Sequence, residues 1–318
     1  MGENFRPDMN DIREAQRRIA PHIHRTPIMT SASLDEIAGA RLFFKCENLQ
    51  RTGSFKMRGA TNAIFSLADE EAAKGVVTPS SGNHGAALAK AARKRNIPAW
   101  VIMPNNSPMV KRRAVEAYGG QITLCEPTIR SRQETAAAVQ ARTGAILIHP
   151  YDNDRIVSGQ GTAAAELLED MPDLDVIIAP VSGGGLLSGT AIASKAMKPG
   201  IRVIGAEPKN ADDAYRSLKS GHIESNETAD TIADGLRAVL APRTFAILQR
   251  LADEISTVTE EEIVAAMRLL WERMKLVVEP SGAISAAPVL NRRIGSEGKR
   301  IGIILSGGNV DLASLPFK

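Results

Sequence analysis

Short runs of apolar and β-branched residues alternate with longer Ala-rich stretches along most of this chain. The short runs predict strands, which are Leu42–Lys45, Val76–Thr78, Ala99–Met103, Gln121–Leu124, Ala145–Ile148, Val176–Val181, Arg202–Ala206 and Ile301–Leu305. The stretches between them predict helices, among them Ala86–Lys94, Ser131–Thr143, Gly161–Met171 and Glu260–Lys275, the last opened by a Thr259/Glu262 capping box. Strands that alternate with helices are typical of parallel sheets covered by helices on both faces. The pattern therefore predicts an α/β fold.

The composition narrows the class of protein. With 318 residues, 43% of them hydrophobic and 24% charged, the chain has the make-up of a globular enzyme. The net charge of +3 and the 4% aromatic content disfavour nucleic-acid binding. Cys46 and Cys125 have no metal-ligand spacing, and no apolar run has membrane-spanning length. We expect a soluble, cytoplasmic protein that has neither a membrane nor a nucleic-acid partner.

One lysine has a distinctive setting. Lys56 follows Phe55 and lies between Gly53 and Gly59, in a stretch with little charge of its own. A catalytic lysine needs such a place, because its amine must be neutral to form an imine. Most lysines are solvated surface charges, so the segment alone leaves both interpretations open.

Three Ser/Gly-rich loops follow predicted strands. Pro79–Gly85 precedes a helix and is either a plain helix cap or an anion site for a substrate carboxylate. In Pro180–Leu187, consecutive glycines allow main-chain amides to approach a phosphate. Leu305–Asn309 ends the last strand. Ligands of open α/β sheets bind beyond the carboxyl ends of the strands, where all three loops fall.

In this order, Ser54-Phe55-Lys56, Ser80-Ser81-Gly82-Asn83-His84-Gly85 and Leu305-Ser306-Gly307-Gly308-Asn309 closely resemble the serine/threonine dehydratase and serine racemase family. These are pyridoxal-phosphate (PLP) enzymes of the tryptophan synthase β-like fold, known as fold type II. The match runs from Arg25-Thr26-Pro27 to Asp311. A Rossmann interpretation fails, because no Gly-x-Gly-x-x-Gly opens the first βα unit. The resemblance implies a small domain, residues 50–148, inserted into a larger one, residues 1–49 and 149–318, with the active site between them.

The resemblance also implies residue roles. Lys56 would bind the cofactor through its amine and act as a base on one face of the substrate, and Ser81 would handle the proton on the other. The cofactor would contact Phe55, Lys56, Asn83, Ser182, Gly183, Gly184, Gly185, Leu186 and Ser306. The substrate would contact Ser80, Ser81, Asn83, His84 and Arg132. Ser306 would face the pyridine nitrogen, and a hydroxyl is too weak an acid to protonate it, which suits elimination and disfavours transamination.

A divalent cation is a further implication of the resemblance. Glu207 and Asp213, with the carbonyl of Ala211, match the family's metal ligands, and hard oxygen ligands suit Mg²⁺ or Ca²⁺. By spacing alone, two acids six residues apart are usually solvated surface charges. The metal would have a structural or activating role, because PLP already supplies the chemistry.

The expected reaction is β-elimination from L-serine, L-threonine or 3-hydroxyaspartate, giving a 2-oxo acid and ammonia. The alternative is a serine racemase that uses Lys56 and Ser81 as a two-face acid/base pair. The intact set of Lys56, Ser81 and Ser306 disfavours a non-catalytic PLP carrier. Arg132 and Arg237 either recognise a second substrate carboxylate or pair with surface acids. A homodimer is usual among relatives, so we expect one here.

Overall fold

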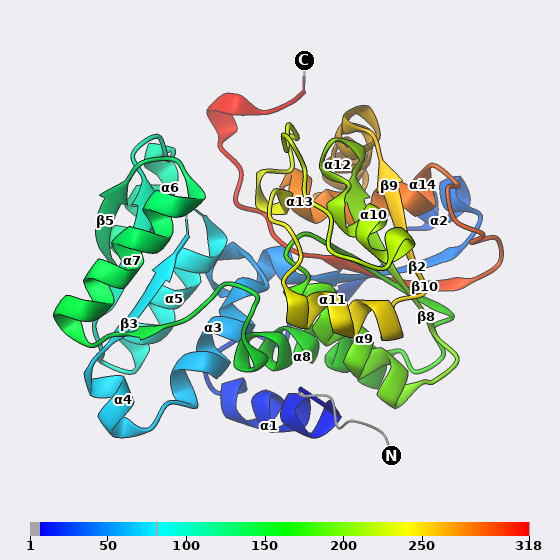
Figure 1. The fold of residues 1–318 in the computed structure, drawn as a ribbon. Helices are drawn as coiled ribbons and strands as arrows, with labels where there is room; N and C mark the ends of the chain where they lie inside the picture. The colour runs from blue at the N-terminus through cyan, green and yellow to red at the C-terminus, as the bar shows by residue number, and fades with distance from the viewer. Residues whose placement is uncertain (1–6, 81, 318) are drawn as a thin grey trace.

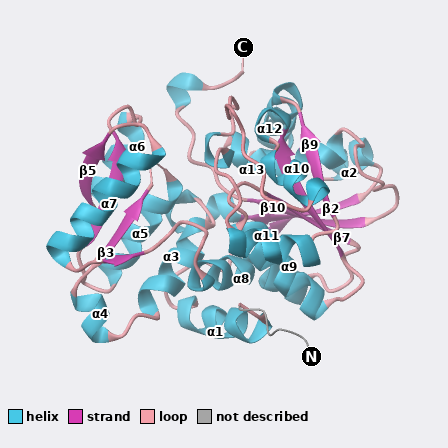
Figure 2. Cartoon of the chain, in the orientation of Figure 1, coloured by secondary structure: helices cyan, strands magenta, loops and turns pink. Residues whose placement is uncertain are grey.

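The computed structural model describes residues 7–80 and 82–317. Its larger sheet has six strands in the order β1-β2-β10-β7-β8-β9 (Figures 1 and 2). β1 is antiparallel to β2, and every other neighbouring pair is parallel. The strands are β1 (Ile28–Met29), β2 (Arg41–Cys46), β7 (Val176–Pro180), β8 (Arg202–Pro208), β9 (Glu254–Val258) and β10 (Arg300–Leu305).

The smaller sheet lies to one side of the first, on the left in Figure 1, and is entirely parallel. Its four strands have the order β5-β4-β3-β6. They are β3 (Val76–Pro79), β4 (Ala99–Pro104), β5 (Gln121–Cys125) and β6 (Ile146–Leu147). The two sheets account for the predicted α/β fold class, which is confirmed. The exact domain boundaries at residues 50 and 148 stay a prediction.

Helices connect the strands and cover the sheets. They are α1 (Met9–Ile19), α2 (Ala32–Ala38), α3 (Lys56–Phe65), α4 (Asp69–Ala73), α5 (Asn83–Lys94), α6 (Met109–Ala117), α7 (Ile129–Thr143), α8 (Asp154–Asp170), α9 (Gly185–Met197), α10 (Asp213–Ser220), α11 (Pro242–Leu251), α12 (Glu260–Met274), α13 (Pro280–Ala283) and α14 (Ala287–Leu290). Short 3₁₀ turns are η1 (Glu47–Leu49), η2 (Arg51–Gly53), η3 (Lys209–Ala211), η4 (Asp234–Leu236), η5 (Ile284–Ala286) and η6 (Leu312–Ser314). α3 packs against both α5 and α8, so it joins the layers that flank the two sheets.

The larger sheet is buried on both faces, which explains its nearly unbroken apolar strands. Successive side chains of a strand point to opposite faces. Accordingly, Val176 and Ile178 pack in the cluster that contains α12, while Ile177 packs with α8 and α9 on the other side. Within the described residues, no helix has the length and apolar character needed to cross a membrane.

Every predicted strand is present, with ends shifted by at most two residues. The prediction missed β1 and β9, two edge strands with too few apolar residues to show a clear pattern. It also started three helices too late: α7 by two residues, and α5 and α8 by more. α8 begins at Asp154, where the side chain of Asn153 accepts a hydrogen bond from Ile156 N at 3.1 Å, and α5 begins at Asn83. The Thr259/Glu262 capping box is confirmed.

Candidate active site

The segment that carries Lys56 is joined to the loop after the last strand. Ser54 forms a β-bridge with Gly307, and the N–H of Phe55 donates to the carbonyl of Ser306 at 3.0 Å. Two of the predicted motifs, about 250 residues apart in the sequence, therefore lie side by side. Lys56 is the first residue of α3, so its side chain emerges where the strand-end loops meet.

The amine of Lys56 is deep in the protein although part of its side chain is accessible. Nζ donates to the carbonyl of Pro150 at 3.3 Å and lies 5.0 Å from the centre of the Phe55 ring. No carboxylate among the described residues pairs with it. Burial therefore lowers the pKa of the Lys56 amine to about 8, since the charged form is poorly solvated there. The neutral amine is therefore still the minor form near physiological pH, but it is far more populated than for an ordinary lysine.

The glycine loop after β7 forms a close-fitting turn at the start of α9. A side chain at Gly183 would place its Cβ 2.5 Å from the Tyr151 ring, and Gly184 has a φ of +86°. Within the described chain, the N–H groups of Gly183, Gly184 and Gly185 donate to no other residue. Three free amides at a helix N-terminus form a site for an anion.

Ser182 contributes to this loop in a way that the sequence did not show. Its hydroxyl donates to the carbonyl of Ala238 at 3.0 Å and accepts from the N–H of the same residue at 2.9 Å. The hydroxyl therefore ties the loop to the segment after η4. The main-chain N–H of Ser182 is the group left for an anion.

Asn83 lies in a chain of side-chain hydrogen bonds. Its Nδ2 donates to Glu279 at 2.7 Å, and its Oδ1 accepts from Asn309 at 2.9 Å. Burial, followed by the negative charge of Asp234, raises the pKa of Glu279 to about 8. The carboxyl group of Glu279 is thus largely protonated at neutral pH.

Ser80 and His84 flank Asn83 at the start of α5. The hydroxyl oxygen of Ser80 accepts from the N–H of Gly85 at 3.0 Å. His84 is buried, its Nε2 is 3.4 Å from the carbonyl of Ile148, and its Nδ1 has no partner among the described residues. Burial, and then the charge of Lys56, lower the pKa of His84 to about 3, so the imidazole is neutral. The remaining residue of this motif, Ser81, lies outside the described residues.

Ser306 is buried at the end of β10, and its hydroxyl donates to the carbonyl of Ser281 at 3.1 Å. A cleft of about 350 Å³ opens near these residues. Its walls come from both sheets' layers and include Asn83, Lys111, Asp234 and Glu279, with an ion pair between Lys111 and Asp234. Lys56 and the glycine loop are not among the lining residues.

The two arginines have different surroundings. Arg132 is half-buried in the first turn of α7, and its Nε has no hydrogen-bond partner among the described residues. Arg237 is exposed and donates to the carbonyl of Thr231 at 2.6 Å. In the described chain no ion pair is found between either arginine and an acid, and recognition of a second carboxylate by either stays a prediction. Neither lines the cleft.

Glu207 and Asp213 come together at the end of β8. Glu207 is fully buried and accepts from the N–H groups of Ala214 and Tyr215 at 2.9 and 2.8 Å. Asp213 accepts from Asn226 at 2.7 Å, and its Oδ2 is buried without a partner in the described chain. Burial raises the pKa of both groups, and the charge of Asp213 raises that of Glu207 further. Within the described residues, no cluster of three or more His, Cys, Asp or Glu side chains is arranged to hold a metal.

The sequence was also compared with families of known proteins. The family model described as "Pyridoxal-phosphate dependent enzyme" matches residues 19–307, which is most of the chain. The chain belongs to this family.

Relatives within the family are close over nearly their whole length. The serine racemase of Oryza sativa is 51% identical over 316 residues, which is 98% of this chain and 93% of the relative. The β-hydroxyaspartate dehydratase of Paracoccus denitrificans is 50% identical, and the match covers 98% of this chain and 99% of that protein. The solved structure of maize serine racemase is 50% identical with a TM-score of 0.95, covering 96% of this chain and 94% of that one. The fold is therefore type II, as the sequence predicted.

The residues of this family member fit a bound PLP. The free amides of Gly183–Gly185 suit a phosphate, and Cβ atoms there would collide with Tyr151 or Thr244. The lowered pKa of the Lys56 amine eases its deprotonation, and the neutral amine is the form that reacts with an aldehyde. Asn83 and Ser306 bring hydrogen-bonding side chains to the same strand ends.

The sequence interpretation missed several residues at this site. His149-Pro150-Tyr151 follows β6, Pro150 accepts from Lys56, and Tyr151 packs on the glycine loop. The signal that found the other loops, a position just beyond a strand, applies equally here. Glu279 has a weaker signal, an acid directly before Pro280 at the start of α13.

Proposed function

We propose that this chain is a PLP-dependent dehydratase that releases ammonia from a small β-hydroxy amino acid by β-elimination. The observation that carries the proposal is the amine of Lys56, with a pKa lowered to about 8, at the start of α3 directly after a segment bonded to Ser306 and Gly307. Relatives named dehydratase and racemase support it.

The cofactor-binding residues are assigned as follows. The N–H groups of the loop from Ser182 to Leu186 would hold the phosphate, Phe55 would lie beside the ring, and Asn83 would bond the 3′-oxygen. The hydroxyl of Ser306 would face the ring nitrogen. When bound, PLP supplies the electron sink that makes the α-proton of an amino acid acidic. The weakly acidic Ser306 limits that sink, which favours loss of a β-hydroxyl over transamination.

Lys56 acts as the base. Its neutral Nζ removes the α-proton on its face of the substrate, and the β-hydroxyl leaves and takes up a proton to become water. Hydrolysis of the remaining enamine yields the 2-oxo acid and ammonia. Ser80, Asn83, His84 and Ser81 hold the α-carboxylate. The low pKa of His84 means that this residue contributes as a neutral hydrogen-bonding group and adds no charge.

Serine racemisation is the second candidate, favoured by the racemase of Oryza sativa at 51% identity. In this reaction Lys56 and Ser81 exchange protons with opposite faces of the α-carbon. Ser81→Ala is expected to abolish L-to-D interconversion and leave elimination from L-serine largely intact. Chiral chromatography and oxo-acid release from the same sample measure both. Equal loss of the two activities would make Ser81 a general binding residue.

A divalent cation is part of the proposal. Glu207 and Asp213 are buried acids whose pKa values are raised, and among the described residues neither forms an ion pair and Asp213 Oδ2 has no hydrogen-bond partner. Mg²⁺ or Ca²⁺ bound by these oxygens and by the carbonyl of Ala211 would balance the charge. The role of this site is to stabilise the loop between β8 and α10.

We further propose 3-hydroxyaspartate as a substrate, with Arg132 binding its second carboxylate. The free Nε of Arg132 and the dehydratase of Paracoccus denitrificans support this choice. A panel of L-serine, L-threonine and 3-hydroxyaspartate, scored for oxo acid and for enantiomer, tests the whole proposal. Turnover of none of them would overturn it. The homodimer and the cytoplasmic location are proposed on the resemblance and on the two free, buried cysteines.

A further inference from the structure

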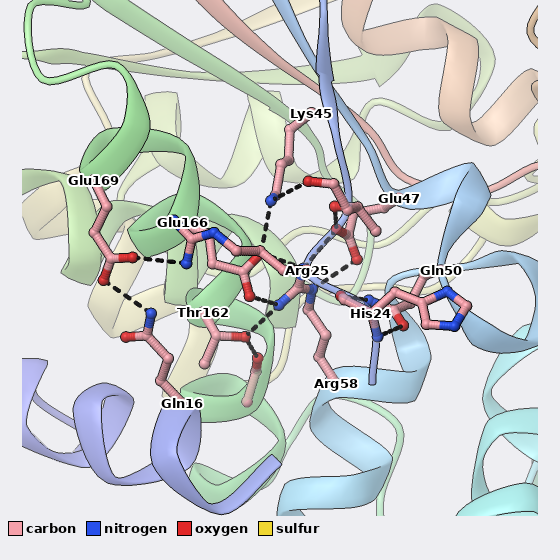
Figure 3. A network of polar contacts seen from close by, with 12 residues as sticks. Gln16, His24, Arg25, Lys45, Glu47, Gln50, Arg58, Thr162, Glu166 and Glu169 are labelled. Atoms are coloured by element: carbon pink, nitrogen blue, oxygen red, sulfur yellow. Dashed lines mark hydrogen bonds and ion pairs between the residues drawn. The ribbon is translucent and has the colours of Figure 1, made fainter. Parts of the chain in front are cut away.

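A buried network of charged side chains joins α3, the helix that begins with Lys56, to β2, η1 and α8 (Figure 3). Lys45 is on β2, Glu47 on η1, Arg58 on α3 and Glu166 on α8. Lys45, Glu47 and Arg58 are fully buried, and Glu166 is 4% exposed. None of the roles assigned above involves this network.

Arg58 is at the centre of the network, and all five of its N–H donors have an acceptor. Towards Glu47, Nε and Nη2 donate at 2.7 and 2.8 Å. Towards Glu166, Nη1 and Nη2 both donate at 2.8 Å, and Nη1 also donates to Thr162 at 3.1 Å. This double fork needs the planar guanidinium and fixes its orientation.

The remaining contacts complete the network. Lys45 donates to Glu166 at 2.6 Å and to the carbonyl of Thr26 at 2.9 Å, and the hydroxyl of Thr26 donates to Glu47 at 2.5 Å. Two cations therefore balance two anions. Although burial raises the pKa of Glu166, the charges of Arg58 and Lys45 bring it below the usual value.

The geometry of α3 connects this network to Lys56. Two residues apart in a helix correspond to a rotation of about 200°, so positions 56 and 58 face opposite sides of the first turn. Lys56 points to the strand-end loops, and Arg58 points to β2 and α8. The network therefore contacts the first turn of α3 on the side opposite to the Lys56 amine.

A structural role alone does not explain why four charges are buried here. Removing charges from water is costly, and well-packed apolar residues often stabilise a fold equally well. Fixing one register of packed elements is the best-attested use of such buried ionic groups. We propose that Arg58 is a positioning residue, which fixes the first turn of α3 against β2 and α8 so that the Lys56 amine is held where the cofactor binds. This inference rests on the function proposed above.

Two variants test the inference. Arg58→Lys keeps the charge but loses the fork. Arg58→Met combined with Glu166→Gln removes one charge of each sign, so Lys45 and Glu47 still balance. The matched control is Leu270→Ala, which truncates a fully buried side chain of α12 in the core on the far side of the larger sheet. It lowers stability without contacting α3.

The first readout uses the apoprotein, in which the rate of Lys56 acylation by acetic anhydride is followed against pH by peptide mass spectrometry. Wild type is expected to titrate near the lowered pKa of about 8, and both Arg58 variants are expected to move towards 10.5, because a loosened turn admits water to the amine. The second readout is kcat and KM of the PLP-loaded enzyme. A misplacement of about 1 Å lowers kcat about 100-fold, with KM little changed. Leu270→Ala is expected to match wild type in both.

The possible outcomes separate the proposals. Folded Arg58 variants with a wild-type Lys56 titration and kcat would overturn the positioning role. If neither variant folds, Thr162→Val, which removes one acceptor and no charge, must shift the Lys56 titration in the same direction, and an unshifted titration overturns the role. Wild type whose Lys56 fails to retain PLP after borohydride reduction would instead overturn the proposed function.

Discussion

Glu166 on α8 and Glu207 on β8 are both buried, yet the pKa of Glu166 is lowered and the pKa of Glu207 is raised. Glu166 is paired with Arg58 and Lys45, and their positive charges lower its pKa despite burial. Glu207 faces Asp213 and, among the described residues, accepts only from main-chain N–H groups, so burial and the like charge raise its pKa. The pairing of a buried acid, more than its burial, thus distinguishes the structural contact at Glu166 from the cation site that we propose at Glu207.

The two sides of helix α3 show the same contrast. On the side that faces β2 and α8, every N–H donor of Arg58 has an acceptor. On the side that faces the strand-end loops, within the described chain, Lys56 lacks a carboxylate partner, and Nδ1 of His84 and the amides of the glycine loop form no hydrogen bond. Buried polar groups are normally satisfied, so the unsatisfied ones support our proposal that cofactor and substrate bind on this side of α3.

The largest expected effect is that of replacing Lys56, on the side of α3 that faces the strand-end loops. Lys56→Ala is expected to lower kcat about 10³-fold or more, because it removes both the cofactor linkage and the base. Borohydride reduction should then retain no PLP on the protein. The contrasting variant is Glu166→Ala, which leaves Arg58 and Lys45 underpaired and should cost about 3–5 kcal/mol of unfolding free energy. If Lys56→Ala keeps wild-type turnover, the assignment of the base is wrong.

Glu279 tests whether an unpaired buried acid weakens the fold as it ionises. Its raised pKa means that its stabilising contribution is complete below about pH 4.5 and is lost as pH rises through about 8. Glu279→Gln keeps the acceptor for Asn83 and removes this titration. The difference in unfolding free energy between variant and wild type should therefore grow with pH by a few kcal/mol, at about 1.4 kcal/mol per unit of pKa shift. Urea titrations between pH 5 and 8 measure the two unfolding free energies, and a difference that does not change with pH would contradict the raised pKa of Glu279. The charges close to this carboxyl group are those of Asp234 and Lys111.

Chelation tests the unpaired acids Glu207 and Asp213. Removal of divalent cations is expected to lower the melting temperature, and Mg²⁺ or Ca²⁺ should restore it. A cation at a hundredfold excess over its dissociation constant stabilises the folded state by about 2.7 kcal/mol. Asp213→Ala should abolish the response to added cation in differential scanning calorimetry. A melting temperature that chelator leaves unchanged in wild type would count against the metal site.

The smallest effect concerns the free Nε of Arg132. A charge-assisted hydrogen bond contributes about 1.5–3 kcal/mol, or roughly ten- to a hundredfold in specificity. Wild type is expected to prefer 3-hydroxyaspartate over L-serine in kcat/KM, and Arg132→Ala should lose that preference. Arg237→Ala is the control, because Arg237 is exposed and bound to the carbonyl of Thr231. A preference for L-serine or L-threonine in wild type excludes the dicarboxylate.

The local pattern of the sequence was enough to place most of the fold. Strands such as β7 and β8 are continuous apolar runs because both faces of the larger sheet are buried. Such runs can be recognised in the sequence without knowing which segments pack against them. The edge strand β9 was missed because Ile255 and Val258 are its only large apolar residues pointing to the core. The start of α8 was missed because Gly159 disfavours a helix, and the predicted helix began only at Gly161. Both glycines are tolerated because α3 and α9 approach too closely for side chains.

The sequence by itself determined the class of fold, the family and the segments that meet at the strand ends. Those features depend on residues close together in the chain. The spacing of apolar residues, the residue types in turns and the order of the motifs are all visible in the sequence itself. The tertiary structure decided which of the charged residues are paired. Lys45 and Glu166 are 121 positions apart, and Asn83 and Glu279 are 196 positions apart, and no local pattern connects either pair. Burial and pairing set the protonation of Lys56, Glu166, Glu207 and Glu279, and both are properties of contacts formed only when distant segments pack together.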